Sequence, residues 1–304
     1  MGLCALAALT LAGCKKNEPA GSVSFKATIS QPTTNAKTGV GAVNMLVWNA
    51  GDQIKVYKDL NTSALFTTTD DNTITATFSG DIAESDTYVA FYPAQNVTVS
   101  GSNYELQLSA QQNGAANTFA PYTYPMYATS DGNGNFTFDS PCALMAIPLN
   151  GNATIGSIEL TGSGDEKLAG KYVINPDDMD NPQFVGEQST VTLSFDESGL
   201  PLSAENNTVV YFALPADRLA NGFSVVFKDV AGTELLTKTV QAHSQNNTQS
   251  KYILMMPEVN VAAPADGFNI TNQGIGEASF GGGLFILLGV GLGIVTLKKK
   301  EDEQ

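Results

Sequence analysis

Short stretches in which polar and apolar residues alternate recur along most of this chain, and they constrain its fold more than any other feature. Residues 23–29, 104–108 and 135–138 each place apolar side chains at every second position, as a half-buried strand requires. Thr, Val, Tyr and Phe dominate these stretches, and no segment sustains the 3.6-residue period of an amphipathic helix. The sequence therefore predicts an all-β fold, with strands at 23–29, 53–57, 73–78, 87–92, 104–108, 135–138, 143–149, 155–160, 171–174, 190–195, 209–214, 223–228, 235–240 and 251–256.

Clusters of turn-forming residues separate the predicted strands. Asn, Gly, Ser and Asp are frequent at residues 131–135, 149–152 and 162–165, and these residue types favour tight turns. Strands at this spacing indicate antiparallel β-sandwiches. Residues 111–129 are predicted to form a long loop, after which the strand pattern restarts. We therefore expect two domains of ordinary size, at residues 14–140 and 141–257.

The chain is strongly acidic. Its 304 residues include 30 Asp and Glu against 15 Lys and Arg, which gives a formal net charge of −15. A protein with this charge repels the phosphates of nucleic acids, so nucleic acid is excluded as a partner. The same charge favours solubility, which suits an exported protein.

The chain lacks the residues for several common catalytic and metal sites. His243 is its one histidine and lies in a predicted turn, and its cysteines are Cys4, Cys14 and Cys142. We expect Cys142, in an apolar run, to be a buried side chain rather than a reactive thiol or half of a disulfide. A His/Cys zinc site cannot be built, and a catalytic triad would depend on His243 alone. No acidic pair of the glycosidase type stands out. We therefore expect no enzyme and no cofactor.

Two acidic stretches invite comparison with calcium sites. Residues 131–135 read Asp-Gly-Asn-Gly-Asn, but the positions that an EF-hand loop needs as Gly and Glu hold Phe136 and Cys142. A hairpin turn is favoured there. Residues 177–180 contain three aspartates between two prolines. For them we expect a solvated loop and no metal, with a calcium clamp as the alternative.

The N-terminus has the layout of a bacterial lipoprotein signal. An apolar run ends in the lipobox Leu11, Ala12, Gly13 and Cys14, and two lysines follow. Cys14 is thus the predicted lipid-attachment site, and residues 1–13 are the predicted signal peptide. Two acyl chains hold a protein stably on a membrane. No basic residue precedes the apolar run, which favours a start codon slightly upstream.

A second apolar segment lies near the C-terminus. Residues 258–279 have the composition of a linker, and residues 280–297 contain a single polar side chain before three lysines at 298–300. At 1.5 Å per residue, a helix over 280–297 is about 27 Å long, at the short limit for spanning a bilayer. Two interpretations of 280–304 stay open. We prefer a sorting tail that is removed, and a permanent transmembrane helix is the alternative.

Several short motifs follow one another in an order that is typical of one protein family. The first comprises Trp48, the pair Gly51 and Asp52, and the strand 53–57. In this order the chain resembles the fimbrillins, the subunits and accessory proteins of type V pili in Bacteroidetes. The resemblance extends over about residues 22–257, with further similar pieces at 87–93, 125–128, 140–145, 158–162, 168–170, 211–215 and 222–225.

This resemblance implies two tandem transthyretin-like β-sandwich domains, exported as a lipoprotein to the outer membrane or cell surface. The implied partners are other fimbrial subunits, the membrane through the N-terminal lipid, and a host or bacterial surface ligand. In polymerising members a protease cuts after an N-terminal arginine and removes the first strand, here residues 23–29. A strand donated by the next subunit then fills the groove, which is a form of β-augmentation.

The chain departs from the family pattern in its arginine. Its only arginine is Arg218, far from the N-terminal arm, so an arginine-specific cut cannot remove the first strand. Either another protease acts or the subunit stays uncut, which suits an anchor or a non-polymerising surface protein. Residues 259–263 are an alternative donor strand.

A second function from a different class stays open. The chain would then be a lipid-anchored β-sandwich that binds a glycan or another surface ligand without polymerising. Glycan binders usually present exposed aromatic rings. We expect Trp48 to pack inside the first domain, whereas Tyr122, Tyr124 and Tyr127 lie in or beside the predicted loop and offer a contact surface.

Overall fold

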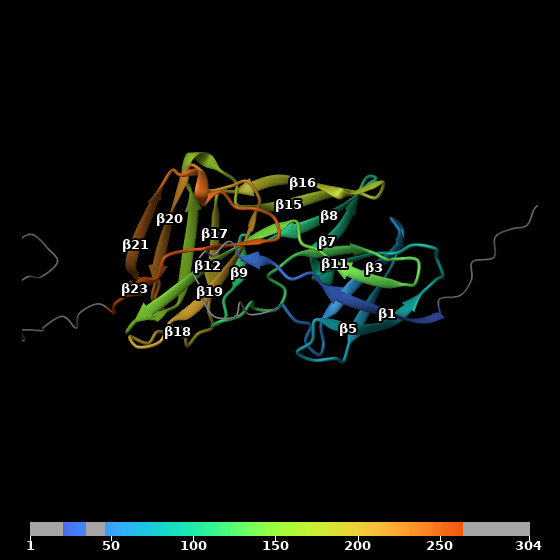
Figure 1. Cartoon of the computed structure of the whole chain (residues 1–304), viewed down its shortest axis with the longest axis horizontal. Helices are drawn as coiled ribbons and strands as arrows, with labels where there is room; N and C mark the ends of the chain where they lie inside the picture. The colour runs from blue at the N-terminus through green and yellow to red at the C-terminus, as the bar shows by residue number, and fades with distance from the viewer. Residues whose placement is uncertain (1–20, 35–45, 264–304) are drawn as a thin grey trace, which may run out of the picture. The chain divides into compact units, whose positions relative to one another are not determined.

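The structure, a computed structural model, describes residues 21–34 and 46–263, and these residues form strands joined by turns (Figure 1). They contain no α-helix, which confirms the predicted all-β fold. None of their helical turns has the length and apolar character needed to cross a membrane. The predicted signal peptide, lipobox and tail at 280–304 lie outside the described residues.

The elements follow one another along the chain as short strands and three single 3₁₀ turns. Their bounds are β1 (Gly21–Ile29), β2 (Thr33–Thr34), β3 (Gln53–Asp59), β4 (Thr62–Thr68), β5 (Thr75–Ile82), β6 (Val89–Tyr92), η1 (Ala94–Asn96), β7 (Val97–Ser100), β8 (Asn103–Leu108), β9 (Gln111–Asn113), β10 (Met126–Thr129), β11 (Asn135–Phe138), β12 (Cys142–Gly151), β13 (Thr154–Ile155), β14 (Ser157–Gly162), η2 (Ser163–Asp165), β15 (Ala169–Asn175), β16 (Asp178–Gln188), β17 (Thr190–Ser194), β18 (Leu200–Pro201), β19 (Thr208–Pro215), β20 (Gly222–Lys228), β21 (Glu234–Gln241), η3 (Ser244–Asn246), β22 (Tyr252–Met255) and β23 (Val259–Val261).

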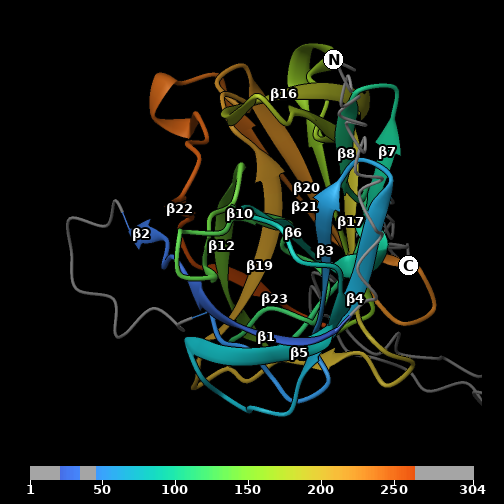
Figure 2. The ribbon, with the colours of Figure 1, turned by 90° about the vertical axis from the view of Figure 1, so that its right-hand side faces the viewer.

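The first sheet has seven strands in the order β10-β6-β3-β4-β5-β1-β11. Strand β1 pairs with β5 in antiparallel and with β11 in parallel orientation, and Figure 2 shows β1 curving beside β5. The two end strands, β10 and β11, are themselves joined. Tyr127 and Asp139 exchange main-chain hydrogen bonds of 2.9 and 3.0 Å, and a second bridge links Ser130 to Phe136.

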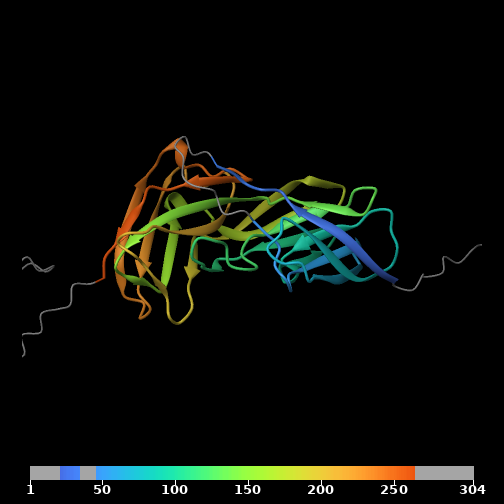
Figure 3. The same cartoon turned by 60° about the horizontal axis from the view of Figure 1, so that its bottom comes forward.

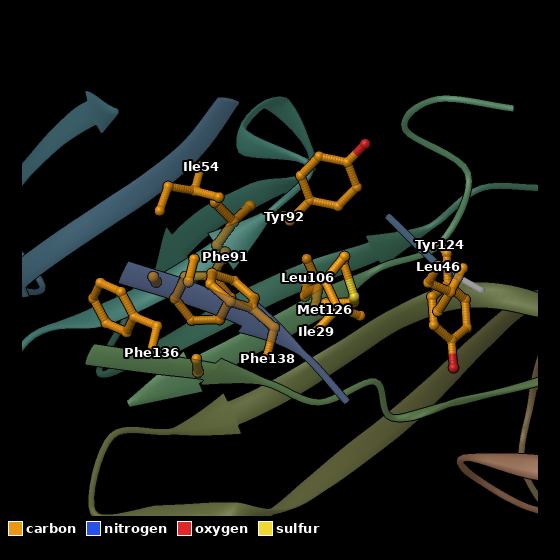
Figure 4. Close-up of a cluster of buried hydrophobic side chains, with 14 of the residues drawn as sticks. Ile29, Leu46, Ile54, Phe91, Tyr92, Leu106, Tyr124, Met126, Phe136 and Phe138 are labelled. Carbon is orange, nitrogen blue, oxygen red and sulfur yellow. The ribbon is translucent and has the colours of Figure 1, made fainter. Parts of the chain in front are cut away.

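The first sheet surrounds an aromatic core. Trp48, Phe78, Phe91 and Phe138 are fully buried in it, and Figure 4 shows Phe91 and Phe138 gathered there beside labelled aliphatic side chains. Edge-to-face ring contacts such as Trp48 with Phe78, 5.0 Å between centroids, give this core geometric specificity beyond its buried area.

A second apolar cluster lies between two further sheets, ordered β19-β12-β22-β2 and β21-β20-β14-β17-β9. Strand β12 serves both cores, because alternate side chains point to opposite faces of a strand. Leu144 and Ala146 pack in the first cluster, whereas Met145 and Ile147 pack in the second. This explains why 143–149 reads as a nearly continuous apolar run rather than an alternating one. Cys142, at the start of the strand, is buried and unpaired, as predicted.

A four-stranded sheet, β16-β15-β8-β7, joins residues from both sides of the predicted domain boundary. Residues 104–108 pair with residues 170–174, and Lys171 Nζ lies 2.9 Å from Glu105 Oε2 across this pairing. The sheet β21-β20-β14-β17-β9 crosses the same boundary through β9, and the sheet β19-β12-β22-β2 crosses it through β2. The division into domains at 14–140 and 141–257 therefore stays a prediction, with three sheets shared across it.

The sequence missed two of the longer strands, β4 and β16, for one physical reason. Strands β4 and β16 are rich in polar residues, and no residue of β16 is fully buried, so alternation gives no clear signal. Residues 111–129, predicted as a loop, also contain the short strands β9 and β10. The acidic stretch 177–180 belongs to the turn and first residues of β16 rather than to a loop alone.

A matched pair of leucines tests the role of β12. We expect Leu144→Ala to lower the free energy of unfolding by about 2–5 kcal/mol, because it removes a fully buried side chain and leaves a cavity. Leu65, which is 54% exposed, provides the control, and Leu65→Ala should change stability by at most about 0.5 kcal/mol. Urea unfolding of both variants measures the difference. Equal losses would contradict the assignment of β12 to the core.

Candidate functional site: the first strand and its slot

Strand β1 is held in a slot that we define by its neighbours β5 and β11 and by Trp48. β5 pairs with it at eight positions, Gly21 to Thr28, and β11 at four, Lys26 to Ile29. Phe25, Ala27 and Ile29 are buried, whereas the alternate residues face outward. The period-two pattern that predicted this strand therefore corresponds to its inward face.

Phe25 is the main apolar contact of β1 in the slot. Its ring lies 5.0–5.1 Å, between centroids, from those of Phe66, Tyr88 and Phe136. These three residues come from β4, the segment before β6, and β11. A strand that occupies this slot needs a large ring at this one position.

Trp48 fixes β1 by a polar contact as well as by packing. Its indole Nε1–H donates a 2.9 Å hydrogen bond to the main-chain oxygen of Ala27. The ring is fully buried and packs edge-to-face on Tyr92 and Phe138, at 5.2 and 5.3 Å. The prediction that Trp48 packs in the core is correct, and its partner within that core is the first strand.

The Gly-Asp pair after Trp48 forms the turn that positions it. Gly51 adopts φ +92°, a conformation that favours glycine. Asp52 is buried, and its Oδ2 accepts a 2.8 Å hydrogen bond from the Asn49 main-chain N–H. Its Oδ1 accepts one of 3.1 Å from the Tyr92 hydroxyl. Burial raises the pKa of Asp52 above its usual value, although these hydrogen bonds act in the opposite direction. The Trp-Gly-Asp motif is thus a structural clamp on β1.

The chain leaves the slot by way of Gln31, whose side chain bonds to the main chain of Leu46 in both directions, at 2.8 and 2.9 Å. It then forms β2, where Thr33 and Thr34 pair in parallel with Tyr252 and Ile253 of β22. Residues 21–34 therefore supply strands to two different sheets. Figure 3 shows this segment, in blue, running from the blue and green strands toward an orange one.

Chemically, the slot is a binding site for an extended strand. Without β1, the facing edges of β5 and β11 would expose main-chain donors and acceptors, and Phe66, Tyr88 and Phe136 would line an open groove. Main-chain hydrogen bonds would give such a groove its affinity, and the alternating pockets would set the register of the occupant.

The C-terminal part of the described chain is already paired. Val259–Val261 (β23), the core of the proposed donor segment, lies parallel to Leu149–Gly151 of β12, and Val261 is buried. Gly151 has φ +127°, and a Cβ there would lie 2.0 Å from the Val261 oxygen. This close approach requires glycine.

The remaining candidate residues lie apart from the slot. Burial raises the pKa of the Cys142 thiol to about 12, so it stays protonated and unreactive. His243 is exposed and caps η3 through its Nδ1, which accepts a hydrogen bond from the Gln245 N–H. Asp131 accepts hydrogen bonds from Asn133 and Asn135 within the predicted hairpin turn.

The proposed calcium clamp and the tyrosine surface are not assembled. Among the described residues no group of three His, Cys, Asp or Glu is placed to hold a metal ion. Tyr122 is 43% exposed, Tyr124 is buried, and Tyr127 is half-buried beside β11. The three tyrosines therefore do not form one contact surface. Lipobox residues 11–14 lie outside the described residues.

Replacing the clamp should loosen β1 in particular. We expect Trp48→Phe to destabilise the fold by about 1–3 kcal/mol, because it removes a buried hydrogen bond and leaves a cavity. Hydrogen exchange of the amides of residues 23–29 should accelerate more than that of β14. Tyr122→Phe, at an exposed ring, is the control. A uniform acceleration through both strands would argue against a specific clamp.

The buried Asp52 carboxyl predicts a pH-dependent difference in stability. A group whose pKa is raised on folding stabilises the folded state below its unfolded pKa, near 3.8, and loses that contribution as pH rises through the folded pKa. The unfolding free energy of the protein minus that of Asp52→Asn should therefore increase as pH falls across this window. Asp131→Asn is the control of opposite sign, since hydrogen bonds from Asn135 lower the pKa of Asp131. Urea unfolding between pH 3 and 7 measures both differences, and equal signs would contradict this account.

Comparison with known proteins gives matches by structure only. No protein-family model matches the sequence, and no curated protein matches it either. A proposed cell adhesion protein from Bacteroides ovatus has 14% identity and a TM-score of 0.46, covering 82% of this chain and 93% of its own. One from Bacteroides uniformis has the same identity and TM-score, with 79% and 93% covered. The tip fimbrial protein of Porphyromonas gingivalis has 12% identity and a TM-score of 0.29, with 73% and 83% covered. This chain is therefore similar in structure to Bacteroidetes proteins described as cell adhesion or fimbrial proteins, the group that its sequence motifs resemble.

Proposed function

We propose that the chain is a cell-surface, fimbrillin-like lipoprotein that serves as a structural subunit or anchor of an adhesive fimbria. In this proposal it consists of two transthyretin-like sandwich domains and is held on the outer membrane by a lipid on Cys14. Its partners are other fimbrial subunits. No catalytic role is included, and the expectation that the chain is not an enzyme stays a prediction.

The observation that carries the proposal is that β1 lies between two strands of the same sheet and could be replaced there by another strand. It is the first described element, it is paired on both sides, and its contacts come from its own alternating side chains and from Trp48. A strand of the same pattern from another copy can make the same contacts. This is the geometry that assembly by strand donation requires.

Two features favour the anchor role over the polymerising one. The chain has no arginine before Arg218, so arginine-specific removal of β1 is impossible. Within the described residues, the last strand that could act as a donor, β23, is paired with β12 of its own chain. With β1 retained, the slot stays filled, and the subunit ends a fibre at the membrane instead of extending it.

The test is the intact mass of the protein purified from native envelopes. The anchor role predicts the mass of a chain that begins at Cys14 and carries lipid, with β1 present. A mass that lacks residues 14–34 would contradict the anchor role and favour a strand-exchanging subunit. In that case SDS-resistant ladders on a gel should accompany it.

Lipid attachment has its own test. We expect Cys14→Ser to abolish lipid labelling and to move the protein from the membrane fraction to the soluble fraction, because a serine cannot form the thioether. Cys142→Ser is the matched control and should keep both the lipid and the membrane attachment, since Cys142 is buried in β12. Membrane retention of Cys14→Ser would contradict the assignment.

A further inference from the structure

A cleft of about 730 Å³, here called the β16 cleft, opens on the side of β10 and β11 that faces away from the aromatic core. Its walls are β10, β11, the β15–β16 hairpin and the loops at residues 216–218 and 250–251. On β11, Phe136 and Phe138 are buried, while Thr137 and the following Asp139 line the cleft. The cleft therefore uses the outer face of strands whose inner face supports the β1 slot. Its volume is typical of ligand pockets, about 300–1,000 Å³.

Arg218, the only arginine in the sequence, is fixed at this cleft and has no carboxylate partner among the described residues. Arg218 Nε donates to the main-chain oxygen of Lys167 at 3.3 Å, and Nη1 donates to the main-chain oxygens of Asp217 and Ala216 at 2.9 and 3.4 Å. The guanidinium carbon lies 5.4 Å from the ring centre of Phe184. Nη2 has no hydrogen-bond partner within the described residues, so an oriented cationic donor remains free for a ligand.

The β16 cleft also contains a carboxylate, opposite in charge to Arg218, and a neutral tyrosine hydroxyl. Asp180, on β16, is exposed and lines the cleft. Tyr127, on β10, is half-buried, and burial together with the charges of Asp139 and Asp180 raises its pKa to about 12. Its hydroxyl therefore stays protonated at neutral pH and can donate a hydrogen bond. Lys251, 2.9 Å from Asp139 at the rim, supplies a second cation.

The cleft also has an apolar surface. Tyr172 and Phe184 pack against each other at 5.2 Å, and Met179 and Pro182 lie on the same hairpin. Asp217 and Lys251 adopt φ of +56° and +66°. Non-glycine residues held in this conformation cost energy and gather at binding and catalytic sites.

The charged groups, hydroxyls and apolar surface of the cleft together favour one class of ligand. The lining carries three carboxylates against two cations, so it does not favour a strongly anionic ligand. It offers acceptors, donors and hydroxyls around an apolar face. A polyhydroxylated ring satisfies all of them, because each hydroxyl donates and accepts while its C–H face packs on apolar carbon.

We propose that the β16 cleft binds a neutral carbohydrate, with sugar hydroxyls bonded by Asp180, Arg218 and Tyr127 and the ring packed against Phe184. None of the aromatic side chains that line the β1 slot, Phe66, Tyr88 and Phe136, lines the cleft. The inference therefore does not depend on the fimbrial role.

The test uses the purified full chain on an array of neutral and acidic oligosaccharides, followed by calorimetric titration with each sugar that is retained. We expect retention of neutral glycans. Asp180→Asn and Tyr127→Phe should each weaken binding by about tenfold or more, since each removes a hydrogen bond in which a charged group or a partly buried donor takes part.

Two controls match these variants. Asp177→Asn changes an exposed acid in the same turn, and Tyr122→Phe changes an exposed tyrosine, and neither residue lines the cleft. Both should bind as the unaltered protein does, and thermal unfolding verifies that all four variants are folded. The proposal is overturned if no glycan is retained, if only acidic glycans are retained, or if the controls lose binding as much as the cleft variants do.

Discussion

The hydrogen bond from the Trp48 indole to the main-chain oxygen of Ala27 is the contact on which the seven-stranded sheet and its aromatic core depend. It joins the first strand to a tryptophan that is itself positioned by the Gly51–Asp52 turn and surrounded by three aromatic rings. A buried indole N–H without an acceptor costs about 1–3 kcal/mol. The aromatic core therefore favours any strand that offers a carbonyl at this place, and β1 is the strand that the chain itself provides.

The second organising element is β12, which divides its side chains between two cores. Its neighbours β19 and β22 extend the same arrangement, and β2 joins β22 on its far side. Residues 21–34 consequently contribute one strand to the seven-stranded sheet and another to the sheet that contains β12. Loss of this segment would open the slot in one sheet and uncover the edge of β22 in another.

Alternation of polar and apolar residues identified β1, β8 and β11 because each has one buried face. The sequence also predicted that Trp48 packs in the core and, from the apolar run around it, that Cys142 is buried and unreactive. Alternation could not identify β16, whose side chains are nearly all polar or half-exposed, nor the β16 cleft. The cleft residues are separated by long stretches of sequence, between Tyr127 and Lys251, and only the tertiary fold brings β10, β11, the β15–β16 hairpin and two loops together around it. Arg218 was notable in the sequence for its rarity, but its stacking on Phe184 depends on tertiary packing.

The bridges between β10 and β11 have a consequence for self-association. A sheet with two free borders can recruit strands from neighbouring molecules at either one, which is a common route to uncontrolled aggregation. Here the two border strands satisfy each other, so the seven-stranded sheet offers no ready template to a stray strand. Recruitment into this sheet is restricted to exchange at a position that is already occupied, and many copies of the chain can therefore lie close together without spontaneous fusion through it.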